Sequence, residues 1–98
     1  PNQEAREGDH MKIFNFKKFE KNTVRAFFSI ELDSGLILHG CSLHSKNGGE
    51  WVGYAQKEYT RHDGTKVREP LITFKDKQTC DKLRDKIIQQ LTIDRFID

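Results

Sequence analysis

Residues 24–32 alternate between apolar and other side chains over nine positions, and this pattern constrains the fold more than any other feature. One set of alternate positions is apolar and comprises Val24, Ala26, Phe28, Ile30 and Leu32. The other set comprises Arg25, Phe27, Ser29 and Glu31. Successive strand residues point to opposite faces of a sheet, so this period of two predicts a strand with one buried face. Arg25 and Phe27 are therefore expected together on its outward face.

Turn-forming residues separate this segment from other strand-like segments. Asp-Ser-Gly at residues 33–35, Asn-Gly at 47–48 and Asp-Gly at 63–64 favour tight turns between strands. The remaining segments predict strands over residues 11–19, 36–43, 51–56 and 66–74. Pro70 restricts the last of these to a sheet edge or a bulge. Together the five segments predict a small antiparallel β-meander.

The hydrophobic period changes after Phe74. Apolar residues then recur at helical spacing, at Cys80, Leu83, Ile87, Ile88 and Leu91. Asp76 is suited to cap the start of this helix. The expected fold class is therefore α+β, with one C-terminal amphipathic helix covering one sheet face. The tail from residue 92 is expected either to extend the helix or to pack Ile93, Phe96 and Ile97 on a neighbouring element.

The length of 98 residues, 35% of them hydrophobic, predicts one small domain, which we place at residues 11–98. Residues 1–10 lack an apolar pattern and are interpreted as a tag remnant or a disordered leader. No run approaches the roughly 18 apolar residues of a membrane helix. A cytoplasmic protein without membrane contact is expected.

Positive charge is unevenly distributed once the leader is set aside. Residues 11–68 carry ten Lys and Arg against six Asp and Glu, whereas residues 69–98 carry six of each. Basic side chains are frequent around the turns at residues 47–48 and 63–64, at Lys46, Lys57, Arg61, Lys66 and Arg68. Such groups neutralise phosphates in nucleic-acid complexes.

Aromatic side chains with neighbouring cations on the free sheet face can add base or sugar contacts. Arg25, Phe27 and Tyr54 are the expected contributors; Trp51 and Tyr54 are an odd number of residues apart, so one of them points outward. The alternative is a protein–protein interaction module whose aromatic face docks a partner protein, while the basic loop keeps the chain soluble.

A metal site is a second possibility at His39, Cys41 and His44. His39 and Cys41 are two residues apart and are expected on one strand face, with His44 as a third ligand. A second closely spaced ligand pair is lacking, so two buried thiols at Cys41 and Cys80 are the preferred interpretation, with no metal.

No arrangement of residues indicates catalysis. The serines lie outside any nucleophile elbow and the carboxylates are scattered singly. The glycines at positions 48, 49 and 53 lie in and beside a hairpin rather than before a helix, so they do not form a phosphate-binding loop. We expect no enzyme, no cofactor and no small-molecule substrate.

Several motifs together resemble the stage V sporulation protein G (SpoVG) family over residues 11–91. They are VRAFFSIELD at 24–33, His39, Asn-Gly at 47–48, Val52, Lys57, Asp-Gly at 63–64, Arg68 and KLRDKII at 82–88. The resemblance implies a small sheet with a C-terminal helix, a homodimer, and a regulator that binds DNA and in some members RNA.

The chain also departs from the family pattern. Where the family has Val-x-Met-Pro-Ser-Lys-Arg, residues 52–58 read VGYAQKE, which lacks the proline and places Glu58 at a basic position. The family's Asp-Ile-x-His-Pro is reduced to Pro70. The resemblance thus implies nucleic-acid contacts for Lys57 and Arg68, and a distant member with altered affinity or target.

Overall fold

The computed structural model describes residues 11–97, which form six strands and one helix. They are β1 (Lys12–Lys21), β2 (Val24–Glu31), β3 (Ile37–Lys46), β4 (Gly49–Gly53), β5 (Gln56–Thr60), β6 (Lys66–Pro70) and α1 (Lys77–Ile93). Strands β1 to β4 form one antiparallel sheet in chain order, and β5 pairs with β6 in a separate two-stranded sheet. The predicted α+β class, with a β-meander followed by one helix, is confirmed.

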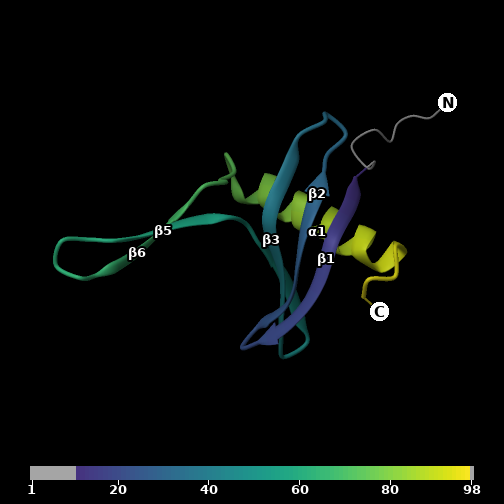
Figure 1. Cartoon of the computed structure of the whole chain (residues 1–98). Helices are drawn as coiled ribbons and strands as arrows, with labels where there is room; N and C mark the ends of the chain where they lie inside the picture. Colours follow the sequence, from purple (N-terminus) through teal and green to yellow (C-terminus); the bar gives the residue numbers. More distant parts are fainter. Residues whose placement is uncertain (1–10, 98) are drawn as a thin grey trace.

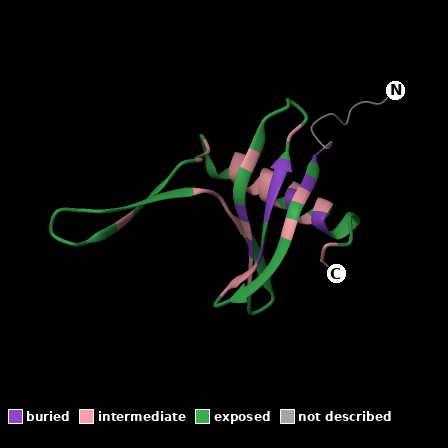
Figure 2. Cartoon of the chain, viewed as in Figure 1, coloured by how far each residue is buried: buried purple, intermediate pink, exposed green. Residues whose placement is uncertain are grey.

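Helix α1 covers one face of the four-stranded sheet, as Figure 1 shows with the helix behind the strands. The core between these layers contains Met11, Ile13, Ala26, Phe28, Ile30, Cys41, Leu43, Ile87 and Leu91. Figure 2 shows the buried positions concentrated on β2 and on the strands and helix beside it. The buried set predicted for the second strand is confirmed for Ala26, Phe28 and Ile30, whereas Ser29, which was expected on the outward face, is buried as well, beside His39.

The turns form where the sequence predicts them. Asn47 and Gly48 join β3 to β4 with φ angles of 52° and 84°. Both values lie in the left-handed region that Asn and Gly tolerate and that a tight hairpin turn requires. Gly35 and Gly64 also have positive φ angles in the turns before β3 and β6.

The fourth and fifth predicted strands differ from those observed. Strand β4 ends at Gly53, and residues 54–55 lead away from the sheet into the β5–β6 hairpin, which Figure 1 shows projecting from the body. The Leu71 amide donates to the Ala55 carbonyl at the base of this hairpin (3.1 Å). Strand β6 ends at Pro70, so the expected continuation to residue 74 is wrong. The described residues measure 58 × 28 × 24 Å as a result of this projection.

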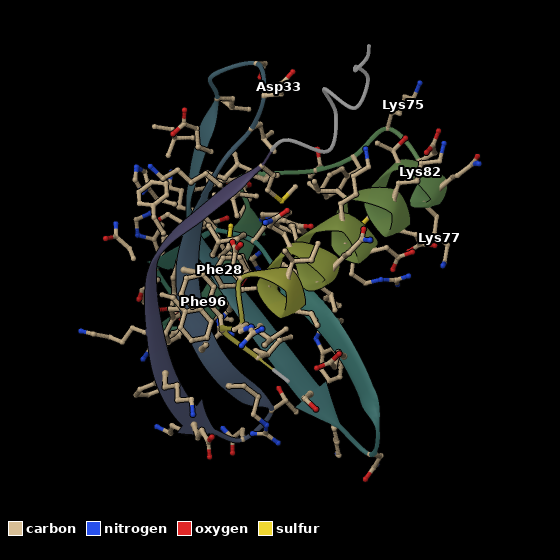
Figure 3. All side chains as sticks on the ribbon, turned by 90° about the vertical axis from the view of Figure 1, so that its right-hand side faces the viewer. Phe28, Asp33, Lys75, Lys77, Lys82 and Phe96 are labelled. Atoms are coloured by element: carbon tan, nitrogen blue, oxygen red, sulfur yellow. The ribbon has the colours of Figure 1, made fainter. Side chains whose placement is uncertain are left out.

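Both ends of α1 have clear local causes. The Asp76 carboxylate accepts a hydrogen bond from the Thr79 amide (2.8 Å), which confirms the predicted cap. At the other end Arg95 has a φ of 62°, and the Phe96 amide donates to the Leu91 carbonyl. The Phe96 ring then stacks on Phe16 of β1, with centroids 4.7 Å apart. The residues after α1 therefore form a separate element that packs Phe96 and Ile97 on the core, and Figure 3 shows Phe96 and Phe28 directed into the layer beside α1. The expectation that Ile93 packs with them is wrong, because Ile93 ends the helix and is exposed.

The interpretation of residues 1–10 as a tag remnant or leader falls outside the described residues. Within residues 11–97, the one helix is too short and too polar to cross a membrane.

Candidate nucleic-acid interface

The β5–β6 hairpin carries four of the predicted phosphate-binding residues, and its tip is held by backbone hydrogen bonds. The Arg61 amide donates to the Thr65 carbonyl (2.8 Å), and the Gly64 amide donates to the Arg61 carbonyl (2.9 Å). The Asp63 carboxylate accepts from the Thr65 amide (2.9 Å), and this bond lowers the pKa of Asp63. The tip is therefore a defined turn whose Asp63 side chain stays ionised beside the basic groups.

The hairpin does not gather its basic side chains on one surface. Paired residues of a two-stranded sheet share a face, and Lys57 is paired with Glu69 whereas Lys66 is paired with Thr60. Lys57 thus lies on the Tyr59 side, 5.8 Å from that ring, and Lys66 lies on the opposite side. Residues 56–70 hold four basic and three acidic side chains, so the hairpin as a whole is close to neutral.

Arg68 is further compensated by a direct partner. Its Nε lies 3.4 Å from a carboxylate oxygen of Glu58, the residue that occupies a basic position of the resembled family. Both side chains are more than half exposed, so this ion pair contributes little to stability. It nevertheless places a negative charge beside the arginine, which reduces the attraction of Arg68 for phosphate.

Arg25 does not share the outward face with Phe27, contrary to the prediction. The pairing of β2 with β3 shifts between Val24 and Ala26, so Arg25 lies in a bulge that turns its side chain toward the helix side. There its guanidinium donates to the carbonyls of Asn22 (3.0 Å), Val24 (3.2 Å) and Ser45 (3.0 Å). Arg25 therefore holds two neighbouring turns together and lines a groove of about 420 Å³ beside Phe96 and Arg95.

Tyr54 is also removed from the expected interface. Its ring packs edge-on against Phe74 with centroids 5.2 Å apart, next to the hydrophobic core. Its hydroxyl is buried without a hydrogen-bond partner among the described residues, and burial raises its pKa. Trp51, rather than Tyr54, is the outward aromatic residue of this region, with 39% of its surface exposed.

His39 and Cys41 lie on opposite faces of β3, so the expectation that they share one face is wrong. Gly40 has a φ of 73°, and the register with β2 shifts at this point. Two residues of β3, His39 and Gly40, therefore oppose the single residue Ser29 of β2, and this bulge reverses the alternation of faces. Cys41 is fully buried, and burial raises the pKa of its thiol to about 11. His39 instead lies 3.0 Å from the Ser29 hydroxyl. Across residues 11–97 no three His, Cys, Asp or Glu side chains are grouped as metal ligands would be.

The strongest local excess of positive charge lies where the β1–β2 and β3–β4 turns meet, which we call the turn end. It comprises residues 17–25 and 45–50, and Figure 1 shows both turns at the same end of the sheet. The turn end contains five basic side chains, at Lys17, Lys18, Lys21, Arg25 and Lys46, and two acidic ones, at Glu20 and Glu50. The Ser45 amide donates to the Thr23 carbonyl (2.9 Å), so the two turns are fixed to each other.

The four lysines of the turn end have freely available charges. Lys17, Lys18, Lys21 and Lys46 are exposed and form no ion pair with any carboxylate among residues 11–97. Lys18 is paired with Ala26 and lines the groove beside Arg25, so the other three are the lysines next to the opposite face of the sheet. The helix differs, because Asp81 lies 2.9 Å from Lys77 and 3.2 Å from Arg84. Cations without carboxylate partners attract an anionic polymer more strongly than compensated ones do.

The sheet face opposite α1, which we call the open face, carries aromatic rings next to these lysines. Phe19 and Phe27 lie with centroids 5.4 Å apart, and His44 and Trp51 lie with centroids 5.5 Å apart. The exposed fractions of Phe19, Phe27 and Trp51 are 46%, 40% and 39%. Lys17 is paired with Phe27 across β1 and β2, which places a cation beside the first pair of rings.

The residues predicted from sequence to contact nucleic acid include Phe27 and Lys46 of this region, but not Phe19, Lys17, Lys18 or Lys21. The available signal was the run of residues 17–21, with three lysines and one phenylalanine in a strand. That run indicates only an edge strand until the fold brings it beside β2 and the second turn. The hairpin residues, in contrast, form a cluster of basic side chains that is evident from the sequence alone.

In comparisons with known proteins, no protein-family model matches the sequence, and no curated protein matches it.

Proposed function

We propose that this protein binds nucleic acid without catalysing a reaction, and that the turn end supplies its principal phosphate contacts. The observation that carries the proposal is the set of exposed, uncompensated lysines next to exposed aromatic rings. Lys17, Lys21 and Lys46 neutralise phosphates, and the release of condensed counterions favours binding. The aromatic residues of the open face contact the bases or sugars that follow the bound phosphates.

The β5–β6 hairpin has a secondary role in this proposal. Lys57 lies on one side of the ribbon, whereas Lys66 and Arg68 lie on the other. One nucleic-acid segment cannot lie against both sides at once. The hairpin therefore contributes fewer than four phosphate contacts, although it contains four basic side chains.

The sequence resemblance to the SpoVG family supports the same class of function. Lys57 and Arg68 are the residues that the resemblance implies, and the structure pairs Arg68 with Glu58. In the proposal this pairing weakens the attraction of the hairpin for phosphates, and the turn end provides most of the electrostatic attraction for nucleic acid.

Binding measured over a series of salt concentrations tests the proposal. The intact chain is titrated into labelled single-stranded DNA, duplex DNA and RNA, with fluorescence anisotropy as the readout. We expect log affinity to fall linearly with log salt concentration for at least one of these ligands. An aromatic face that docks a partner protein instead predicts no binding to any of the three, even at low salt.

A further inference from the structure

We infer that the open face is a stacking platform for unpaired bases, so the ligand is a single nucleic-acid strand rather than a duplex. This inference rests on the proposed function and adds the form of nucleic acid that the site recognises.

The exposed aromatic residues are concentrated in a way that other exposed apolar residues are not. Phe19, Phe27 and Trp51 lie on three strands of one sheet face, together with the His44 ring. The other large exposed apolar residues do not form such a group: Tyr59 lies on β5, Leu36 and Ile37 are neighbours at the start of β3, Leu71 follows β6 and Ile93 ends α1. Single exposed apolar residues are normal, whereas a contiguous aromatic patch marks an interaction surface.

The two ring pairs are close enough for successive bases of one strand. Phe27 is paired with Ser42, and His44 lies two residues further along β3. Diagonal neighbours of this kind are separated by roughly 7–8 Å on a sheet face. One base can thus stack on the Phe19–Phe27 pair while the next base stacks on the His44–Trp51 pair. An extended nucleic-acid strand can span this distance between successive bases. Bases in a duplex are stacked on one another, and their faces are not available.

The second ring pair is held rigidly in its position. The planes of His44 and Trp51 are 7° apart, and the two nitrogens of His44 lie 3.0 Å from the Thr23 hydroxyl and 2.8 Å from the Ser42 hydroxyl. Gly53 permits this arrangement, because a Cβ there would lie 2.7 Å from the Ser42 oxygen and 3.0 Å from Nε2 of His44. A ring fixed before binding loses little conformational freedom when a base stacks on it.

The charge beside the rings favours a nucleic-acid strand over an apolar protein partner. Lys17 is paired with Phe27, Lys21 is paired with Val24, and Lys46 follows His44 by two residues on β3. These cations border the aromatic patch where the phosphates of a stacked strand would lie. An apolar protein segment on the same rings would leave them without anionic partners.

Trp51 permits a direct test, because it is the single tryptophan of the chain. The intact protein is titrated with a single-stranded DNA of about 12 nucleotides, with the matching RNA, and with a duplex of the same sequence. We expect saturable quenching of Trp51 emission by at least one single strand, and an affinity for that strand at least about fivefold above that for the duplex. Equal affinities together with unchanged Trp51 emission would overturn the inference.

Variants separate stacking from general charge attraction. Trp51→Ala and, independently, Phe27→Ala are expected to lower single-strand affinity by about five- to a hundredfold, with a smaller loss for duplex. Trp51→Phe, which keeps a ring, should restore most of the affinity. Tyr59→Ala on the hairpin is the matched control, since Tyr59 is 38% exposed and Trp51 39%, and it should leave the single-strand to duplex ratio unchanged.

The outcomes distinguish the inference from the proposed function. Salt-dependent binding with a single-strand to duplex ratio that none of the aromatic variants alters would overturn the stacking platform and retain the proposed function. Failure of the intact chain to bind any nucleic acid at low salt would overturn both. Circular dichroism of each variant shows whether its fold is intact, and Phe27→Ala provides a second test if Trp51→Ala does not fold.

Discussion

The imidazole of His44 stacks on the indole of Trp51 with ring centroids 5.5 Å apart and planes 7° apart. The Thr23 hydroxyl is within hydrogen-bond distance of Nδ1 of this imidazole, and the Ser42 hydroxyl is within hydrogen-bond distance of Nε2. The ring therefore connects the β1–β2 turn to the open face of the sheet. Partial burial lowers the pKa of His44 below its ordinary value of 6.5. The neutral ring is therefore the form that the folded protein favours.

This lowered pKa predicts a pH dependence of stability. Below the ordinary His pKa the unfolded chain binds a proton that the folded chain resists, so the contribution of His44 is present at about pH 7.5 and declines as the pH falls through the folded-state pKa. Chemical denaturation gives the free energy of unfolding at about pH 7.5 and pH 5.5. Between these two pH values, the free energy of unfolding should decrease more for the natural chain than for His44→Gln. Equal losses in both proteins would contradict this assignment.

Gly53→Ala tests whether the His44 ring depends on the absence of a side chain at position 53. The added Cβ would meet Ser42 and His44 at distances shorter than normal contacts, so one of these side chains must move. We expect a destabilisation of roughly 1–3 kcal/mol and altered Trp51 emission in the free protein. Gly49→Ala is the control, because the nearest atom to its added Cβ is 3.6 Å away. An unchanged Trp51 spectrum in Gly53→Ala would count against a rigid ring pair.

Tyr54→Phe is expected to stabilise the protein or leave its stability unchanged. The Tyr54 hydroxyl is buried without a partner among residues 11–97, and removing such a group relieves a desolvation cost of about 1–3 kcal/mol. Thermal or urea denaturation measures the effect, with the exposed Tyr59→Phe as a comparison. A clear loss of stability in Tyr54→Phe would show that the hydroxyl has a favourable partner.

We also expect a dimer, in which the sheet edges or the projecting hairpin pair with a second copy of the chain. Strand β1 is an edge of the four-stranded sheet, and β5 with β6 forms an isolated ribbon, which is marginally stable by itself. Pairing with a second copy would protect both elements. Light scattering at roughly tens of micromolar should therefore give about twice the chain mass of 11.5 kDa. A mass equal to one chain would reject the dimer.

The features predicted correctly from sequence depend on local patterns. The alternation around Phe28, the Asn47–Gly48 turn and the Asp76 cap follow from side-chain period, backbone freedom and short-range hydrogen bonding. Each requires knowledge of only a few neighbouring residues. This is why the α+β class and the order of its elements could be predicted.

The errors arose where tertiary structure changes the direction of a side chain. A bulge turns Arg25 away from Phe27, and a second bulge at Gly40 separates His39 from Cys41. A regular period of two cannot reveal either of them, since one extra residue reverses the faces. Tyr54 was placed outward because strand four was expected to continue through it, whereas the chain leaves the sheet there and buries the ring.

The turn end could not be assembled from sequence for a related reason. Lys21 and Lys46 are 25 positions apart, and only the pairing of β2 with β1 and β3 brings their turns together. The hairpin residues are contiguous and therefore conspicuous in the sequence. Their division between two faces becomes evident only from the register of β5 with β6.

The central claim, that the turn end binds nucleic-acid phosphates, is tested most directly by the salt dependence of binding in charge variants. The test variant replaces Lys17, Lys21 and Lys46 with Gln. The control replaces Lys75, Lys77 and Lys82 with Gln, which removes the same charge around the start of α1, where Figure 3 shows these three residues. A third variant replaces the four basic residues of the hairpin with Ala, at Lys57, Arg61, Lys66 and Arg68.

The slope of log affinity against log salt concentration is the quantity to compare among these proteins. For single-stranded DNA we predict that the turn-end variant has a slope about two units shallower than the natural chain, since each phosphate contact contributes about 0.7. The hairpin variant should change less than its four charges would suggest, and the helix control should change least. A turn-end variant with the natural slope and affinity, in a protein shown to be folded, would contradict the account.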